Sequence, residues 1–138
     1  MGRQYKFRAI DYVNPNWVYG SYVVINNEYE IVECIWELNS TRATPIDSST
    51  LGEYTGLKDK NGVEIYEGDI LRLLNSDVLC EVVYEAPSFC RRWLNSKVSN
   101  VRGIEIESMA YNTHIAYEVI GNIYEHKHLL EAHENENK

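Results

Sequence analysis

Three histidines near the end of the chain have the spacing that most resembles a metal-binding pattern. His126, His128 and His133 form an H-x-H-x4-H array, and Glu131 and Glu134 lie beside them. Imidazole and carboxylate groups at close spacing can hold a divalent cation. The array falls in a polar terminal segment, and such segments are usually poorly ordered. A solvated tail is therefore the preferred interpretation, metal binding is the alternative, and no metal site is predicted.

Four carboxylates gather in a short central stretch, at Asp59, Glu64, Glu67 and Asp69. Two carboxylates can act as acid and base when a cleft holds them close together and raises the pKa of one. Here they stand in and beside turns, where an Asp side chain commonly bonds to nearby backbone. Turn formation is therefore the preferred role, and catalysis is the weaker alternative.

Glycines mark the turns of that stretch. Asn61 and Gly62 form the dipeptide most typical of a tight hairpin, and Gly62 accepts a positive φ without a Cβ clash. A second tight turn is expected at Gly68 and Asp69, and a third at residues 75–77. Reversals so close together predict short strands that close as a small twisted barrel.

One basic and aromatic stretch occurs in an otherwise acidic chain. Its members are Phe89, Arg91, Arg92, Trp93, Lys97 and Arg102. Small β-barrels hold single-stranded nucleic acid with arginines and stacked aromatic rings. The preferred interpretation is a solvated loop whose Trp packs inward, because the net charge of −8 disfavours polyanions. Nucleic acid or an acidic protein partner is the alternative.

Common catalytic motifs do not occur in the sequence. It lacks a nucleophile elbow, a P-loop, the H-E-x-x-H pattern and a dinucleotide-binding glycine motif. Cys34, Cys80 and Cys90 show no C-x-x-C spacing and are typical of core thiols in a reducing compartment. We therefore predict a protein without catalytic activity or cofactor. Activity from residues that converge only in space stays open.

The elements that must position these residues are extended. Residues 4–11 alternate with the period of two that a strand with one wet face shows. Residues 17–25 and 28–35 predict a hairpin joined at Asn26 and Asn27, because Asn tolerates a positive φ. Neither face of residues 28–35 is purely polar, which indicates burial on both sides or an oligomer contact.

Later segments mix predicted loops with predicted strands. Residues 36–50 are polar and aperiodic and are expected to form a loop or linker, in which Asp47 could cap a short helical turn. Residues 86–104 are less regular. Residues 117–124 predict a last strand, in which Gly121 marks a bulge or a close approach of backbone.

The bulk properties suit one globular domain, or one domain with a small appended subdomain. The chain has 138 residues, of which 44% are hydrophobic and 25% charged. It has no run of 18 apolar residues and no visible signal peptide, so we expect no membrane contact and a cytoplasmic location.

Three blocks of sequence resemble one family. They are KFRAID near the start, GEYTGLKDKNGVEIYEGDIL in the middle and YEVIGNIYEHKHLL near the end. In order and spacing they are similar to the YopX family of small phage and prophage proteins. The resemblance implies an all-β homo-oligomer with a barrel-like C-terminal part and no established biochemical activity. Ile10 replaces a frequent aromatic residue of the family, and His126-Lys127-His128 replaces a frequent Asn-Pro segment.

These observations predict an all-β fold, with a small SH3-like or meander barrel in the C-terminal part and an N-terminal β-hairpin subdomain. Residues 1–50 hold the first strand, the hairpin and a linker and could serve as an oligomerisation subdomain, residues 51–130 form the barrel, and residues 131–138 are a charged tail. The expected function is that of an oligomeric accessory protein of a phage or prophage that binds a protein of host or phage. A barrel that binds nucleic acid through residues 89–102 is the alternative.

Overall fold

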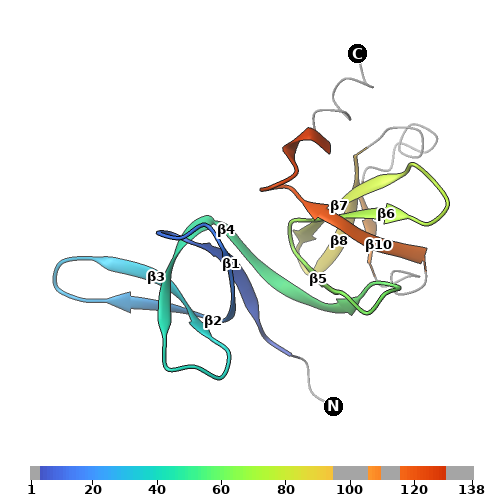
Figure 1. Ribbon diagram of the computed structural model, residues 1–138. Helices are drawn as coiled ribbons and strands as arrows, with labels where there is room; N and C mark the ends of the chain where they lie inside the picture. Colours follow the sequence, from blue (N-terminus) through green and yellow to red (C-terminus); the bar gives the residue numbers. More distant parts are fainter. Residues whose placement is uncertain (1–3, 95–105, 110–115, 130–138) are drawn as a thin grey trace. The chain divides into compact units, whose positions relative to one another are not determined.

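The computed structural model describes residues 4–94, 106–109 and 116–129, and it confirms the all-β fold class (Figure 1). The strands of the described residues are β1 (Phe7–Asp11), β2 (Trp17–Asn26), β3 (Ile31–Glu37), β4 (Ala43–Lys58), β5 (Glu64–Tyr66), β6 (Asp69–Leu73), β7 (Leu79–Glu85), β8 (Ser88–Trp93), β9 (Ile106–Ser108) and β10 (Tyr117–Asn122). They form two sheets, ordered β1-β2-β3-β4-β5 and β10-β6-β7-β8-β9. No helix in this part of the chain is long and apolar enough to cross a membrane.

The chain divides into two units, Met1–Tyr54 and Thr55–Lys138, and the division falls inside β4. The sequence predicts a boundary slightly earlier, after residue 50. Each unit has its own apolar core. The buried core residues are Ala9, Val18, Ile35 and Ile46 in the first unit, and Ile65, Leu71, Cys80, Val82, Trp93, Met109 and Tyr117 in the second.

In the first unit the strand pairings form a closed ring. β1 pairs with β2, β2 with β3, β3 with β4, and β4 returns to β1. The core side chains point into this ring. Gly20 permits the close packing of β2 on β3, because a Cβ at this position would lie 1.9 Å from the backbone oxygen of Trp36.

The predicted loop over residues 36–50 is confirmed only for residues 38–42, which join β3 to β4. Residues 43–50 belong to the strand, because pairing with β1 and β3 satisfies their backbone despite the polar side chains. The Asp47 segment forms a bulge against β1 instead of a helical turn. Within the bulge, the Thr50 hydroxyl accepts the N–H of Ile10 at 2.8 Å and donates to the carbonyl oxygen of Asp47 at 2.6 Å.

In the second unit, glycines stand in the turns that join β4, β5 and β6. Gly62 has a φ of 80° and Gly68 a φ of 92°, so both occupy the region that disfavours side chains. Asp69 begins β6, and its Oδ2 accepts the N–H of Tyr66 at 2.8 Å across the turn. Asn61 lies in the first of these turns.

Asp59 ties the first of these turns to the last strand. Its Oδ1 accepts the N–H groups of Asn61 at 2.8 Å and Val63 at 2.9 Å. Its Oδ2 accepts the N–H of Val119 in β10 at 2.9 Å, although 60 residues separate the two. One buried carboxylate therefore satisfies three backbone donors.

Two further predictions for this unit meet different outcomes. Residues 88–93 are not irregular: they form β8, which pairs with β7 throughout. The register of β10 shifts between Val119 and Gly121, so the predicted bulge is confirmed.

The second sheet runs from β10 to β9, and no pairing of described residues joins these end strands. The closed ring of pairings lies in the first unit, whereas the sequence places a barrel in the C-terminal part.

Replacing Asp59 should therefore destabilise the second unit strongly. Asp59→Ala leaves three backbone N–H groups without their acceptor, which costs about 2–4 kcal/mol of unfolding free energy. Lys60→Ala is the matched control, because the Lys60 side chain is exposed, and its effect should stay within about 0.5 kcal/mol. Urea unfolding followed by circular dichroism measures both, and equal stabilities of the two variants would contradict this role of Asp59.

Candidate interaction surface

The β2–β3 hairpin carries many of the exposed apolar side chains of the first unit. Its strands are rich in Val, Ile and Tyr, which favour extended backbone. Asn27 organises the turn, since its Oδ1 accepts the N–H groups of Tyr29 at 2.9 Å and Glu30 at 3.0 Å. The hairpin is confirmed, but neither Asn26 nor Asn27 has a positive φ, so the predicted turn geometry is wrong.

The hairpin extends beyond the parts of β1 and β4 that pair with it. β1 pairs with β2 only as far as Gly20, and β4 pairs with β3 only from Cys34 onward. β2 and β3 continue to pair with each other up to Asn26 and Ile31. Residues 21–26 and 31–33, here called the distal ribbon, reach past β1 and β4 (Figure 1). An isolated two-stranded ribbon is marginally stable in water, so a covering contact would stabilise it.

The hairpin face that points away from the ring core contains no charged side chain. This outer face consists of Trp17, Tyr19, Ser21, Val23 and Ile25 on β2, and Val32, Cys34 and Trp36 on β3. At its β1 side the guanidinium carbon of Arg8 lies 4.4 Å from the ring centre of Trp17. Tyr19, Ile25 and Trp36 are 40%, 45% and 45% exposed. Cys34 is covered by its neighbours, and burial raises the pKa of its thiol. The outer face is therefore apolar and partly exposed to solvent.

An open pocket of 630 Å³ adjoins the outer face, lined by Ser21 and residues 36–41. The indole of Trp36 is held in place here, because its Nε1 donates to the backbone oxygen of Ser40 at 2.8 Å. Leu38 lies beside it and is 55% exposed. An anchored aromatic ring next to a hollow is typical of the residues that dominate protein interfaces.

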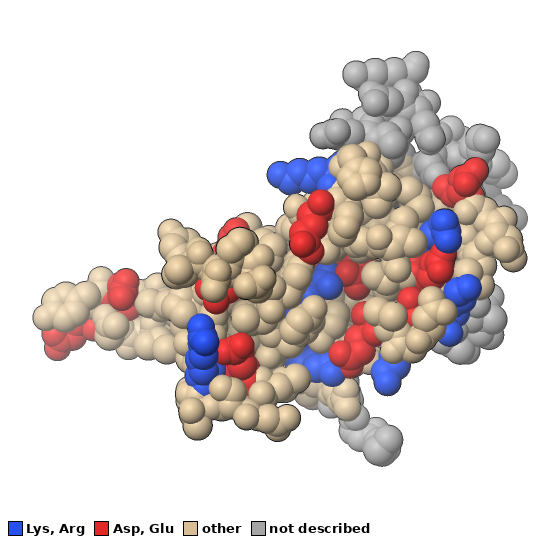
Figure 2. All heavy atoms as spheres, in the orientation of Figure 1, with Lys and Arg blue, Asp and Glu red and all other residues tan. Residues whose placement is uncertain are grey.

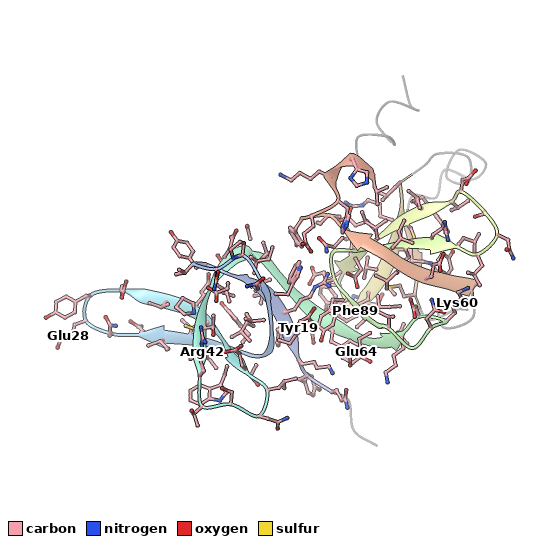
Figure 3. All side chains as sticks on the ribbon, in the orientation of Figure 1. Tyr19, Glu28, Arg42, Lys60, Glu64 and Phe89 are labelled. Atoms are coloured by element: carbon pink, nitrogen blue, oxygen red, sulfur yellow. The ribbon has the colours of Figure 1, made fainter. Side chains whose placement is uncertain are left out.

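The hairpin tip is acidic as well as apolar. Tyr29 is 91% exposed and stands between Glu28 and Glu30. Figure 3 shows Glu28 at the free end of the hairpin. The sequence contains no Lys or Arg between Arg8 and Arg42, and Figure 2 accordingly shows red but no blue at this end. The surface thus combines an uncharged outer face with a negative tip.

On the opposite, inner face, Tyr22 and Glu33 join the two strands at the start of the distal ribbon. The Tyr22 hydroxyl donates to Oε1 of Glu33 at 2.6 Å. This hydrogen bond is the main reason that the pKa of Glu33 lies below its ordinary value of 4.5, and a hydrogen bond with Ser48 adds to the effect. The same hydrogen bond is the main reason that the pKa of Tyr22 is raised.

The basic and aromatic stretch is built largely into the second unit. Arg91 is buried, with its guanidinium carbon 4.2 Å from the ring centre of Tyr117. Trp93 belongs to the apolar core, and Phe89 packs edge-to-face on Tyr84 with ring centres 5.3 Å apart. The two residues most suited to stacking and phosphate contact, Trp93 and Arg91, are therefore covered.

Arg92 is exposed, and two carboxylates face it. Its guanidinium nitrogens lie 3.5 Å from Oε1 of Glu85 and 3.9 Å from Oε1 of Glu81. Burial raises the pKa of Glu81, and the charge of Arg92 opposes that shift. Lys97 and Arg102 lie outside the described residues.

The other candidate residues are engaged in local structure or fall beyond the described part. His126 Nδ1 accepts the N–H of Asn122 at 3.0 Å, and its ring centre lies 6.0 Å from that of His128. His133 lies outside the described residues, within which no cluster of three metal-ligating side chains occurs. Asp59 and Asp69 bond to turn backbone, as expected for carboxylates beside turns.

The sequence assigns an oligomer contact to the hairpin strands, but it does not identify the outer face as the surface that makes it. It assigns Trp36 and Leu38 to a loop, whereas Trp36 ends the apolar row of β3. The usable signal is that residues 17–26 are uncharged and that, on β3, Val32, Cys34 and Trp36 alternate with Glu33, Ile35 and Glu37. Alternate residues of a strand share one face, so this row predicts an uncharged face.

Fold and surface together define an all-β protein of two antiparallel sheets with an apolar, acid-tipped hairpin. A family model described as YopX protein matches residues 6–131, and the chain belongs to this family. The structure is similar to the crystal structure of protein EF1440 from Enterococcus faecalis, with a TM-score of 0.51 and 24% sequence identity. That likeness covers 94% of this chain and 99% of that chain, and it concerns the fold alone. No curated protein matches the sequence.

The Tyr22–Glu33 pair predicts a specific loss of stability in acid. The pKa of Glu33 is lower in the folded than in the unfolded chain, so its contribution is fully present above the unfolded value, near 4.5. It disappears as the pH falls through the lower folded value. Tyr22→Phe removes the main cause of the shift, so the wild type should lose more stability than this variant on acidification.

Urea unfolding at a series of pH values between neutrality and acid measures this difference. The phenylalanine variant is matched to the wild type, because it keeps the ring that packs in the core of the first unit. Parallel stability curves for the two proteins throughout the acid range would contradict the assignment.

Proposed function

We propose that this chain is a non-catalytic module, encoded by a phage or prophage, that self-associates and binds a protein partner through the β2–β3 hairpin. The observation that carries the proposal is the uncharged outer face with its exposed aromatic and aliphatic side chains. A contiguous exposed apolar surface of this kind marks a protein contact. Removing it from water contributes about 25 cal/mol for each Å² of apolar area.

The charge distribution supports self-association at this face. A net charge of −8 makes two copies repel each other at long range. Contact between them is least opposed where neither copy brings a charge, and the outer face meets that condition from Tyr19 toward the tip, beyond the stack of Arg8 on Trp17. The acidic tip would instead favour a basic surface on a protein of host or phage.

The absence of catalysis belongs to the same proposal. The groups that could do chemistry serve the fold: Asp59 and Asp69 hold turns, and Arg91 packs against Tyr117 inside the second unit. A group committed to a structural contact is poorly placed to bind and release a substrate. The exposed apolar hairpin offers contact area rather than reactive groups.

Binding of nucleic acid through residues 89–102 stays a prediction of the alternative function. The burial of Arg91 and Trp93 and the acidic neighbours of Arg92 weigh against it. Fluorescence polarisation with single-stranded and duplex DNA at about 50 mM salt separates the two functions, because phosphate contacts are strongest at low salt.

Light scattering coupled to size-exclusion chromatography tests the proposed function. The wild-type protein should elute at micromolar concentration with a mass above that of one chain. Trp36→Ser removes the anchored indole and should weaken association about tenfold or more, since one interface hot spot carries that much free energy.

Val13→Ser is the matched control, because Val13 is 85% exposed but lies outside the hairpin. It should leave association unchanged. Circular dichroism establishes that both variants fold. A wild-type protein that stays strictly monomeric at micromolar concentration would contradict the proposal, as would equal effects of the two substitutions.

A further inference from the structure

The direction of each backbone group along β2 follows from its hydrogen bonds. Successive residues of a strand turn their N–H and C=O groups alternately toward the two neighbouring strands. The carbonyl of Asn16 accepts the N–H of Asp11 at 2.9 Å, so even-numbered residues face β1. The carbonyl of Tyr19 accepts from Leu38 at 3.2 Å, so odd-numbered residues face β3.

Beyond the end of β1, the even-numbered residues of β2 face an open edge. Pairing with β1 stops at Gly20, and no other described strand pairs with this side of β2. The N–H and C=O groups of Tyr22, Val24 and Asn26 therefore point outward. They do not contribute to the pairing with β3.

This edge lacks the features that normally protect a strand from pairing with another chain. Such protection comes from Lys, Pro, a bulge or a covering element. Residues 21–26 read SYVVIN, their pairing with β3 is regular, and Val24 and Ile25 are 51% and 45% exposed. An open edge of this composition is a template for a further strand.

We propose that residues 22–26 of β2 pair antiparallel with the same residues of a second copy of this chain. The inference rests on the proposed self-association and adds a strand-edge contact to the contact made by the outer face. A two-fold axis at Val24 pairs Val24 with Val24 of the second copy, and Tyr22 with Asn26 of the second copy. This register engages all three outward-facing residues, and the two distal ribbons become one four-stranded sheet.

The distribution of charged residues in the hairpin favours a second copy of the chain as the partner of this edge. The hairpin contains Glu28, Glu30, Glu33 and Glu37 and no Lys or Arg, so two hairpins repel wherever these acids meet. Residues 21–26 contain no charge. The two-fold register therefore sets no like charges opposite each other, whereas a basic partner would gain nothing from this uncharged edge.

Disulfide trapping tests the register. In Val24→Cys the two introduced residues would lie directly opposite each other, with Cα atoms about 5.5 Å apart, inside the range of a disulfide. In Ile25→Cys the two copies of the residue are diagonal neighbours about 7–8 Å apart, outside that range. Ile25 is a matched control because its exposure is similar, and the native cysteines Cys34, Cys80 and Cys90 are buried.

The expected result is a cross-linked dimer on mild oxidation of the Val24→Cys protein, at least tenfold more abundant than with Ile25→Cys or the wild type. Equal cross-linking of the two variants, or none with either, would overturn the pairing. Val24→Pro adds a second measurement: it removes an outward N–H that β3 does not use, and it should weaken the association seen by light scattering about tenfold or more. Val24→Thr keeps that N–H and should leave the dimer intact.

These outcomes separate the inference from the proposed function. Should Val24→Pro remain associated while Trp36→Ser becomes monomeric, self-association through the outer face stands and the edge pairing is rejected. Should the wild type be monomeric, both are rejected. Association that appears only with another protein added, in a chain that does not cross-link, assigns the edge to a different partner and overturns the pairing.

Discussion

The extension of the β2–β3 hairpin beyond its pairing with β1 and β4 is the constraint on which the interaction surface depends. β1 covers β2 as far as Gly20 and β4 covers β3 only from Cys34, so the ring ends before the hairpin does. Inside the ring, Val18 and Ile35 are buried in the core. Beyond it, Val and Ile residues continue on both strands without a covering layer. The same residue types that form a core in one place thus form an exposed surface in the next.

The polar residues of the chain mostly support this framework. The Thr50 hydroxyl holds the bulge that lets β4 follow β1 around the ring, and Asn27 closes the hairpin turn through its side chain. Asp59 performs a comparable task in the second unit, where it joins a turn to β10. The pair of Tyr22 and Glu33 fixes the two hairpin strands to each other where the ring ends. Polar chemistry builds the scaffold, and the apolar hairpin provides the contact surface.

The sequence predicted the features that depend on neighbouring residues and missed those that depend on distant ones. Gly62 and Gly68 signal their turns locally, and alternation with β-branched residues signals the hairpin. Residues 43–50 were assigned to a loop because their strand pairing comes from β1 and β3, which no local pattern reveals. Arg91 suggested an exposed basic patch in the sequence. Its burial against Tyr117 depends on a residue 26 positions away, and no local pattern shows that contact. The outer face was missed because the burial of one hairpin face depends on closure of the ring.

Amide hydrogen exchange along β2, followed by NMR at two protein concentrations, tests the central claim most directly. The amides of Val23 and Ile25 bond to β3 within one chain, so their protection should not depend on concentration. The amides of Tyr22 and Val24 face the open edge, and the account predicts protection at high concentration that is lost on dilution. Rates at Tyr22 and Val24 that are fast and equal at both concentrations would contradict it.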